Sequence, residues 1–161
     1  SVRAVVHEDK TVLQVLNPVT GPVRLRVYPE RCTRCRVCEL VCTSTHGQGF
    51  SPHAARLRVE FLGLDSYKPV TCILCGQCIK ACPTGALSFH PELRYVQLDL
   101  EKCNSCKDCV QACPVEVVRF DEQRSLPIIC DMCRGAPSCA LWCQPEAIVT
   151  ERQKERRNNG A

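Results

Sequence analysis

The hydrophobic residues of this chain occur in short stretches that alternate with polar ones. Residues 24–28 (RLRVY) and 56–61 (RLRVEF) alternate with a period of two, which is typical of half-buried strands. The apolar stretches 86–89 and 95–98 lie on either side of His90-Pro91-Glu92, a sequence that predicts a hairpin turn. We therefore expect small paired strands.

The helical periodicity extends no further than a single turn. Segments 78–82 (CIKAC), 109–113 (CVQAC) and 139–143 (CALWC) each fit one turn of helix. Pro83 and Pro114 directly follow two of these segments, and proline ends a helix because it lacks a backbone N–H group. One more short strand is predicted over 117–120. Together these elements predict an α+β fold of short hairpins and single-turn helices.

A membrane span is not expected, because no apolar run approaches the ~18 residues that a spanning helix needs. The charged segment 151–161 (ERQKERRNNGA) has no apolar residue except its last alanine, and we expect a solvated tail or a docking segment for an acidic partner. The many thiols favour a cytoplasmic location, where reducing conditions keep thiolates free for metals.

Cysteine is the outstanding feature of the composition. The chain has 16 Cys among 161 residues, whereas aromatic residues make up only 5%. A chain so poor in large apolar side chains needs cross-links to offset the conformational entropy of its loops. The cysteines are therefore structural, through either disulfides or metal.

The cysteines fall into four repeated blocks. The first three share the spacing C-x2-C-x2-C-x3-C, and the fourth is C-x2-C-x5-C-x3-C. The blocks are Cys32, Cys35, Cys38 and Cys42; Cys72, Cys75, Cys78 and Cys82; Cys103, Cys106, Cys109 and Cys113; and Cys130, Cys133, Cys139 and Cys143.

This grouping of three near cysteines and one far cysteine matches [4Fe-4S] clusters. Three thiolates in a tight loop bind three corners of one cube, and in bacterial ferredoxins the fourth cysteine, which proline follows, binds the other cluster of a pair. Cys82-Pro83 and Cys113-Pro114 match that pattern. Zinc sites use two C-x2-C pairs and have no use for a third nearby cysteine. Disulfides within such loops are strained.

The formal charge does not indicate nucleic-acid binding. Four thiolates around a core of charge +2 give each site about −2, so four clusters change the formal +4 to about −4. The 21 Lys and Arg residues then compensate for buried negative clusters. The chain has no G-x-G-x-x-G or phosphate-binding loop, so binding of a flavin or nicotinamide needs another subunit.

Other polar residues near the blocks have weaker interpretations. The four histidines, His7, His46, His53 and His90, are scattered, and we expect surface or hydrogen-bonding roles rather than metal ligation. Trp142 is expected to shield a cluster from water. Positive charges beside the cysteine loops could favour the reduced state; they are Arg31, Arg34, Arg36, Lys102, Lys107 and Arg134.

The spacing also predicts which blocks pair. Twenty residues separate Cys82 from Cys103, which is enough for one hairpin, so the second and third blocks form one lobe. By elimination, the first and fourth blocks form the other lobe. We expect an outer lobe from residues 1–62 and 125–150, an inner lobe from 63–124, and a tail from 151–161.

The sequence resembles the four-cluster ferredoxin-like electron-transfer subunits of molybdenum and tungsten oxidoreductases and of related hydrogenase and formate complexes. The resemblance rests on residues 30–42, 78–87, 109–118 and 130–143. Residues 42–59 (CTSTHGQGFSPHAARLRV) look most like the small subunits of tungsten aldehyde oxidoreductases and of their benzoyl-CoA reductase relatives.

The resemblance implies a ligand set for each cluster. These sets are Cys32, Cys35, Cys38 and Cys143; Cys42, Cys130, Cys133 and Cys139; Cys72, Cys75, Cys78 and Cys113; and Cys82, Cys103, Cys106 and Cys109. The chain departs from the pattern where Thr43 follows Cys42 and Gln144 follows Cys143, so the helix ends in the outer lobe should differ.

The resulting expectation is a non-catalytic relay subunit with four [4Fe-4S] clusters. Its partner is expected to be a catalytic molybdenum or tungsten subunit, with a flavin- or NAD-binding subunit or another copy of the chain as a further partner. The alternatives are a free polyferredoxin, a subunit of a hydrogenase or formate dehydrogenase complex, and a zinc-stabilised interaction module.

Overall fold

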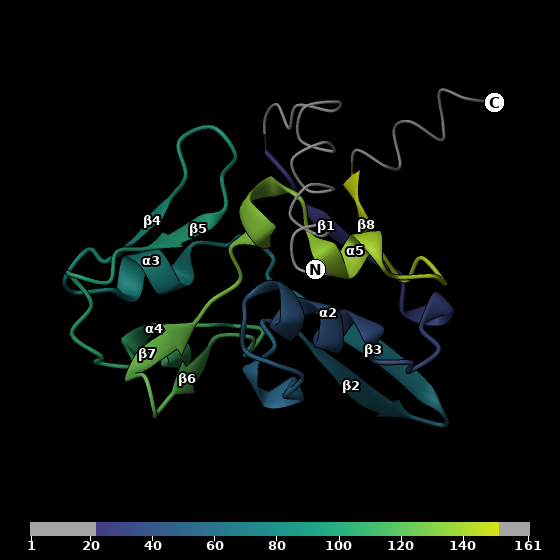
Figure 1. The fold of residues 1–161 in the computed structure, drawn as a ribbon. Coiled ribbons are helices and arrows are strands. Elements are labelled where there is room, and N and C mark those ends of the chain that lie inside the picture. The colour runs from purple at the N-terminus through teal and green to yellow at the C-terminus, as the bar shows by residue number, and fades with distance from the viewer. Residues whose placement is uncertain (1–21, 152–161) are drawn as a thin grey trace, which may run out of the picture.

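The computed structural model of the chain describes residues 22–151. Eight short strands and a few short helices make up this part of the chain (Figure 1). The strands are β1 (Leu25–Val27), β2 (Arg58–Gly63), β3 (Ser66–Val70), β4 (Leu87–Phe89), β5 (Val96–Leu98), β6 (Arg119–Asp121), β7 (Leu126–Ile128) and β8 (Ile148–Thr150). The helices are η1 (Pro29–Arg31), α2 (Val37–Thr45), η2 (Pro52–Ala54), α3 (Gln77–Ala81), α4 (Asp108–Gln111), η3 (Met132–Gly135) and α5 (Ser138–Leu141). The predicted α+β class is confirmed.

All strands pair in antiparallel twos, as β1–β8, β2–β3, β4–β5 and β6–β7. The hairpin predicted around His90-Pro91-Glu92 is β4–β5, in which Leu87 pairs with Leu98. The strand expected over 117–120 begins two residues later, because Arg119 is the first residue that pairs with β7. Residues 117 and 118 are instead buried in the core.

The single-turn helices lie where the cysteine segments predict them. α3 ends before Cys82-Pro83 and α4 ends before Cys113-Pro114. α2 is the exception, because it continues through Cys42 to Thr45, a total of nine residues. Thr43 stands at the position that Pro83 and Pro114 occupy after α3 and α4, so no proline stops α2 at Cys42.

Two long-range pairings organise the chain. Strand β1 pairs with β8, so that Leu25 lies opposite Thr150, and this joins the two ends of the described chain. Helix α2 packs against α5, whereas α3 packs against α4. Figure 1 shows α2, α5, β1 and β8 gathered on one side and α3, α4 and β4–β7 on the other. The first cysteine block therefore meets the fourth, and the second meets the third.

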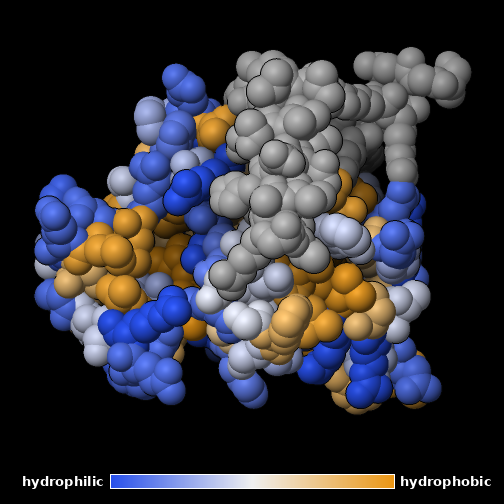
Figure 2. All heavy atoms as spheres, in the orientation of Figure 1, coloured by the Kyte–Doolittle hydropathy of each residue, from blue (hydrophilic) through white to orange (hydrophobic). Residues whose placement is uncertain are grey.

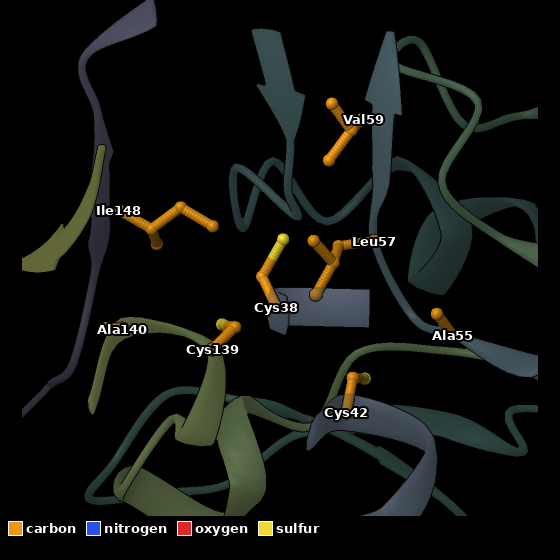
Figure 3. Close-up of a cluster of buried hydrophobic side chains, with 8 residues drawn as sticks. All are labelled: Cys38, Cys42, Ala55, Leu57, Val59, Cys139, Ala140 and Ile148. Carbon is orange, nitrogen blue, oxygen red and sulfur yellow. The ribbon is translucent and has the colours of Figure 1, made fainter. Parts of the chain in front are cut away.

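Each pair of blocks lies in its own small hydrophobic core. One core is formed by Cys38, Cys42, Ala55, Leu57, Val59, Cys139, Ala140 and Ile148. Figure 3 shows its cysteines coming from α2 and α5 and facing aliphatic side chains of β2 and β8. The other core is formed by Cys78, Leu87, Val96, Cys109, Val118 and Ile129. Cysteines thus take the place of the large side chains that the composition lacks.

Among residues 22–151, no helix has both the length and the apolar character needed to cross a bilayer.

Candidate metal centres

The three C-x2-C-x2-C loops share one backbone conformation. In each loop the residues just before and just after the middle cysteine have positive φ; they are Arg34 and Arg36, Leu74 and Gly76, and Ser105 and Lys107. Five of these six are not glycine, and each such residue costs roughly 1–2 kcal/mol in this region. Alternating left-handed residues turn backbone N–H groups toward a common centre, which makes an anion-binding concavity. Each loop therefore stores backbone strain beside its cysteines.

The turn after the fourth cysteine is also repeated. The third residue beyond it has positive φ in three blocks, at Gly85, Glu116 and Glu146. Cys143 therefore begins the same turn as Cys113, and Glu146 N donates to Cys143 O at 3.0 Å. The turn after Cys143 therefore has the same conformation as the others, although Gln144 stands where two other blocks have proline. In the first block α2 replaces this turn, so the departure expected there does occur.

We call the four predicted ligand sets groups 1 to 4. Group 1 is Cys32, Cys35, Cys38 and Cys143; group 2 is Cys42, Cys130, Cys133 and Cys139; group 3 is Cys72, Cys75, Cys78 and Cys113; and group 4 is Cys82, Cys103, Cys106 and Cys109.

Groups 3 and 4 each line a cavity. All four cysteines of group 4 line one cavity, together with Leu87, Leu98 and Phe120. All four cysteines of group 3 line a second cavity, which Cys130 of group 2 also borders. Figure 2 shows a hollow of hydrophobic side chains framed by hydrophilic ones on the α3 side of the molecule. Each of these cavities is lined by all four cysteines of its group.

Groups 1 and 2 are brought together by the packing of α2 against α5. Burial raises the pKa of Cys38 to about 12, with smaller contributions in the same direction from the charges of Glu39, Cys143 and Cys35. Burial raises the pKa of Cys42 to about 11, and the charge of Cys133 acts in the same direction. Cys38, Cys42 and Cys139 share one buried core and Cys143 packs against it, so each fourth cysteine lies in the same core as the other block.

The buried thiols resist ionisation. Burial raises the pKa of Cys78 and of Cys109 to about 11, and it raises the pKa of Cys130 and Cys139 well above the ordinary value. Four thiolates cannot share such a pocket unless a cation offsets their charge. A metal centre supplies that charge, since coordination deprotonates a thiol.

Hydrogen-bond donors also surround the sulfur atoms. Arg56 N donates to Cys42 Sγ at 3.3 Å, and Leu74 N donates to Cys72 Sγ at 3.4 Å. The Thr84 hydroxyl lies 3.5 Å from Cys82 Sγ. Slight desolvation opposes ionisation of Cys82, but this hydroxyl and nearby backbone N–H groups outweigh it and lower its pKa. These donors favour thiolates.

An unpartnered buried N–H group tests whether a cluster fits group 2. Arg56 Nε is buried and has no hydrogen-bond partner among the described residues, although Arg56 N already contacts Cys42 Sγ. An acceptor is therefore missing beside these sulfur atoms, and a sulfide or a cluster-bound thiolate would supply one. All sixteen cysteines lie within the described residues, and none forms a disulfide. The donor set fits cubes of iron and sulfide.

Two of the tuning residues expected from the sequence contact other parts of the protein: Arg34 donates to Tyr67 Oη at 2.9 Å, and Lys102 pairs with Asp99. Lys107 pairs with Glu122 and also lines the cavity of group 4. Trp142 is 56% exposed, and its expected role in shielding a cluster stays a prediction.

Two residues that lie beside the sulfur atoms of group 2 were not predicted from the sequence to do so. His46 Nε2 lies 3.8 Å from Cys133 Sγ, and Arg56 lies beside Cys42. The position of His46, four residues after Cys42, was the available signal, since helical residues i and i+4 share a face. Nothing in RLRVEF distinguishes Arg56 from an ordinary strand residue.

The fold and the thiol groups define a ferredoxin-like iron–sulfur protein. Two models of the family "4Fe-4S dicluster domain" match residues 31–87 and 71–117. Together with the sixteen cysteines, these two dicluster matches account for four [4Fe-4S] clusters.

Individual proteins also have sequences similar to that of this chain. The polyferredoxin-like subunit of an aliphatic sulfonate oxidoreductase from Pyrococcus furiosus is 39% identical over 119 residues, which cover 73% of this chain and 69% of that protein. The B subunit of the anaerobic dimethyl sulfoxide reductase from Haemophilus influenzae is 30% identical over 142 residues. This match covers 74% of this chain and 68% of that protein. The present protein belongs to the family of polyferredoxin-like [4Fe-4S] electron-transfer subunits of oxidoreductases.

Among solved structures, the BamBC complex of benzoyl-CoA reductase with 1,5-dienoyl-CoA contains a similar chain. The TM-score is 0.46 and the identity is 22%, over 80% of this chain and 74% of that one.

Proposed function

We propose that this chain relays electrons between a catalytic molybdenum or tungsten subunit, of the aldehyde oxidoreductase type, and an acceptor, without catalysis of its own. The observation that carries the proposal is the burial of four-thiol groups that belong to [4Fe-4S] dicluster domains. A [4Fe-4S] cluster supplies one-electron chemistry when bound, and four thiolates leave no iron open to substrate.

Groups 1 to 4 are the proposed ligand sets. Their support differs in kind, since shared cavities support groups 3 and 4, whereas electrostatic contacts between blocks support groups 1 and 2. In each group the fourth ligand comes from the partner block. Each half of a lobe therefore holds part of its neighbour's cluster, and neither half binds a complete one alone.

The groups follow one another in a fixed order. Cys38 of group 1 and Cys139 of group 2 belong to one buried core, and Cys130 of group 2 borders the cavity of group 3. Cys78 of group 3 and Cys109 of group 4 belong to the other buried core. These contacts support the order 1, 2, 3, 4, in which groups 1 and 4 face partners.

Two lobes, each with two clusters, are the proposed domain arrangement. Because β2 pairs with β3 and β6 with β7, the chain passes between the lobes near residues 71 and 129, a few residues beyond the predicted boundaries of 62 and 124. Arginines hold the lobes together reciprocally. Arg58 donates to Val115 O and Glu116 O, while Arg119 donates to Pro52 O at 3.2 Å and to His53 O at 3.1 Å.

Residues 42–59 and the relatives support an oxidoreductase partner. The polyferredoxin-like subunit from Pyrococcus furiosus and the B subunit from Haemophilus influenzae both carry the names of oxidoreductase complexes. A reducing compartment such as the cytoplasm suits sixteen unpaired thiols.

Anaerobic purification of the tagged chain from its own source tests the function. We expect a brown complex that bleaches with dithionite and contains tungsten or molybdenum in a second subunit. Purification of the chain alone, with its clusters intact, would instead support a free polyferredoxin. A colourless preparation rich in zinc would overturn the relay.

A further inference from the structure

We infer that His46 and Arg56 are positioning residues for the cluster of group 2, and that they raise its reduction potential selectively. This inference rests on the proposed function, because it assumes that group 2 binds a cluster. The two residues come from the end of α2 and from the segment before β2, and they meet at the loop of the fourth cysteine block.

Asp131 is the centre of this network. Its Oδ1 accepts a hydrogen bond from Cys133 N at 3.0 Å and pairs with Arg56 Nη1 at 3.0 Å. His46 Nε2 lies 3.4 Å from the same oxygen. These three side chains are between 12% and 23% exposed, so the contacts are largely shielded from water.

The network directs donors at two sulfur atoms of group 2. With its proton on Nε2, His46 lies within hydrogen-bond distance of Cys133 Sγ at 3.8 Å. Arg56 N donates to Cys42 Sγ at 3.3 Å, and the unpartnered Arg56 Nε is buried in the same region. The contact of His46 with Cys133 Sγ comes from a side-chain nitrogen, whereas Arg56 N is a backbone donor, as Leu74 N is at group 3.

The direction of the effect follows from charge. A cluster gains a negative charge on reduction, so N–H groups and a guanidinium near its sulfur atoms stabilise the reduced form. Asp131 opposes this effect, but Arg56 neutralises its charge and the carboxylate accepts bonds from the loop rather than facing the sulfur atoms alone.

A separate metal ion at this place is the competing interpretation. His46, Asp131 and Cys133 offer ligand atoms within 4.8 Å of one another. However, Asp131 Oδ1 already serves Cys133 N and Arg56, and Cys133 is a proposed cluster ligand. Hydrogen-bond donation therefore accounts for the arrangement better.

The test is a redox titration of the complete chain, followed by electron paramagnetic resonance. His46→Phe removes the side-chain donor beside Cys133 Sγ, and Arg56→Met removes the guanidinium with its buried Nε while leaving the backbone donor to Cys42 Sγ in place. We expect the midpoint of one cluster alone to fall in each variant. The expected size is about a tenfold change in its reduced-to-oxidised ratio at fixed potential, which is 59 mV for one electron. His46→Gln keeps an N–H donor, so its midpoint should stay close to that of the wild type.

His53→Gln is the matched control, because His53 is an exposed histidine near the same segment. Four unchanged midpoints in iron-replete His46→Phe and Arg56→Met proteins would overturn the inference, as would an equal shift of all four clusters. If His46→Phe loses iron, Arg56→Met carries the test, and an unchanged midpoint in iron-replete Arg56→Met protein overturns the inference as well. A wild-type chain without iron would instead defeat the proposed function itself.

Discussion

The thiol of Cys130 lies within electrostatic range of the thiol of Cys72, although 57 residues separate them in the sequence and they belong to different groups. Both cysteines stand where the chain passes between the proposed lobes, directly after β3 and β7. The same two passages that connect the lobes therefore also bring groups 2 and 3 together. An electron path through the chain depends on this joint.

The joint should weaken when its arginines are removed. Arg119→Ala deletes donors to Pro52 O and His53 O, and we expect the free energy of unfolding to fall by about 1–2 kcal/mol. The midpoint of thermal bleaching measures this change. Lys102→Ala is the control, because its surface pair with Asp99 is worth less than about 1 kcal/mol. Equal effects from both variants would show that Arg119 is not part of a joint.

Cys106→Ser should remove one ligand of group 4. Cys106 lines the cavity of that group, so the variant should lose about four of its irons or retain a damaged cluster there. Stability of the inner lobe should fall with it, because ligation and folding are coupled. Iron analysis and paramagnetic resonance measure the loss, with the exposed Lys80→Ala as control. An unchanged iron content and an unchanged spectrum would contradict the assignment.

Glu39 is a buried carboxylate beside Cys38 of group 1. Its side chain is 3% exposed, and its Oε1 accepts a hydrogen bond from Val59 N at 2.9 Å. Glu39→Gln keeps this acceptor but removes the negative charge, so the midpoint of the group 1 cluster should rise. A redox titration measures the shift, and the exposed Glu30→Gln should leave it unchanged. A fall in that midpoint would contradict the charge argument.

Exposed apolar side chains stand near both ends of the proposed relay. Trp142, beside Cys143, is 56% exposed, and Leu100, near Cys103, is 61% exposed. Truncation of a buried aromatic contact commonly weakens an interface by about 2 kcal/mol. We therefore expect Trp142→Ala and Leu100→Ala to weaken binding of different partners while the iron content stays unchanged. Binding measurements with the purified partners would contradict this if neither variant had any effect.

Much of the fold follows from the sequence because the cysteine spacing encodes local geometry. The loops, the single-turn helices before Pro83 and Pro114, and the hairpin of β4 and β5 are all set by neighbouring residues. Strands β3, β7 and β8 were not predicted. Ser66–Val70 contains Pro69, and β7 and β8 are only three residues long, so their patterns are weak. β3 and β7 form local hairpins with β2 and β6, whereas the pairing of β8 with β1 depends on tertiary contacts.

The surroundings of the candidate sites were harder to predict than the ligands. Arg31, Arg34 and Lys107 were candidates for tuning, but each stacks on an aromatic ring of a nearby strand or turn. His46 approaches Cys133 Sγ because the packing of α2 against α5 brings the fourth block to it, whereas Arg56 N contacts Cys42 of the first block. Sequence spacing specifies what a loop can bind, whereas the folded chain determines which distant side chains surround it.

The content of iron and acid-labile sulfide in anaerobically isolated protein tests the central claim most directly. We predict about sixteen of each per chain, with paramagnetic signals of [4Fe-4S] clusters after reduction. Protein that is folded but contains zinc, or contains neither iron nor sulfide, would contradict the account.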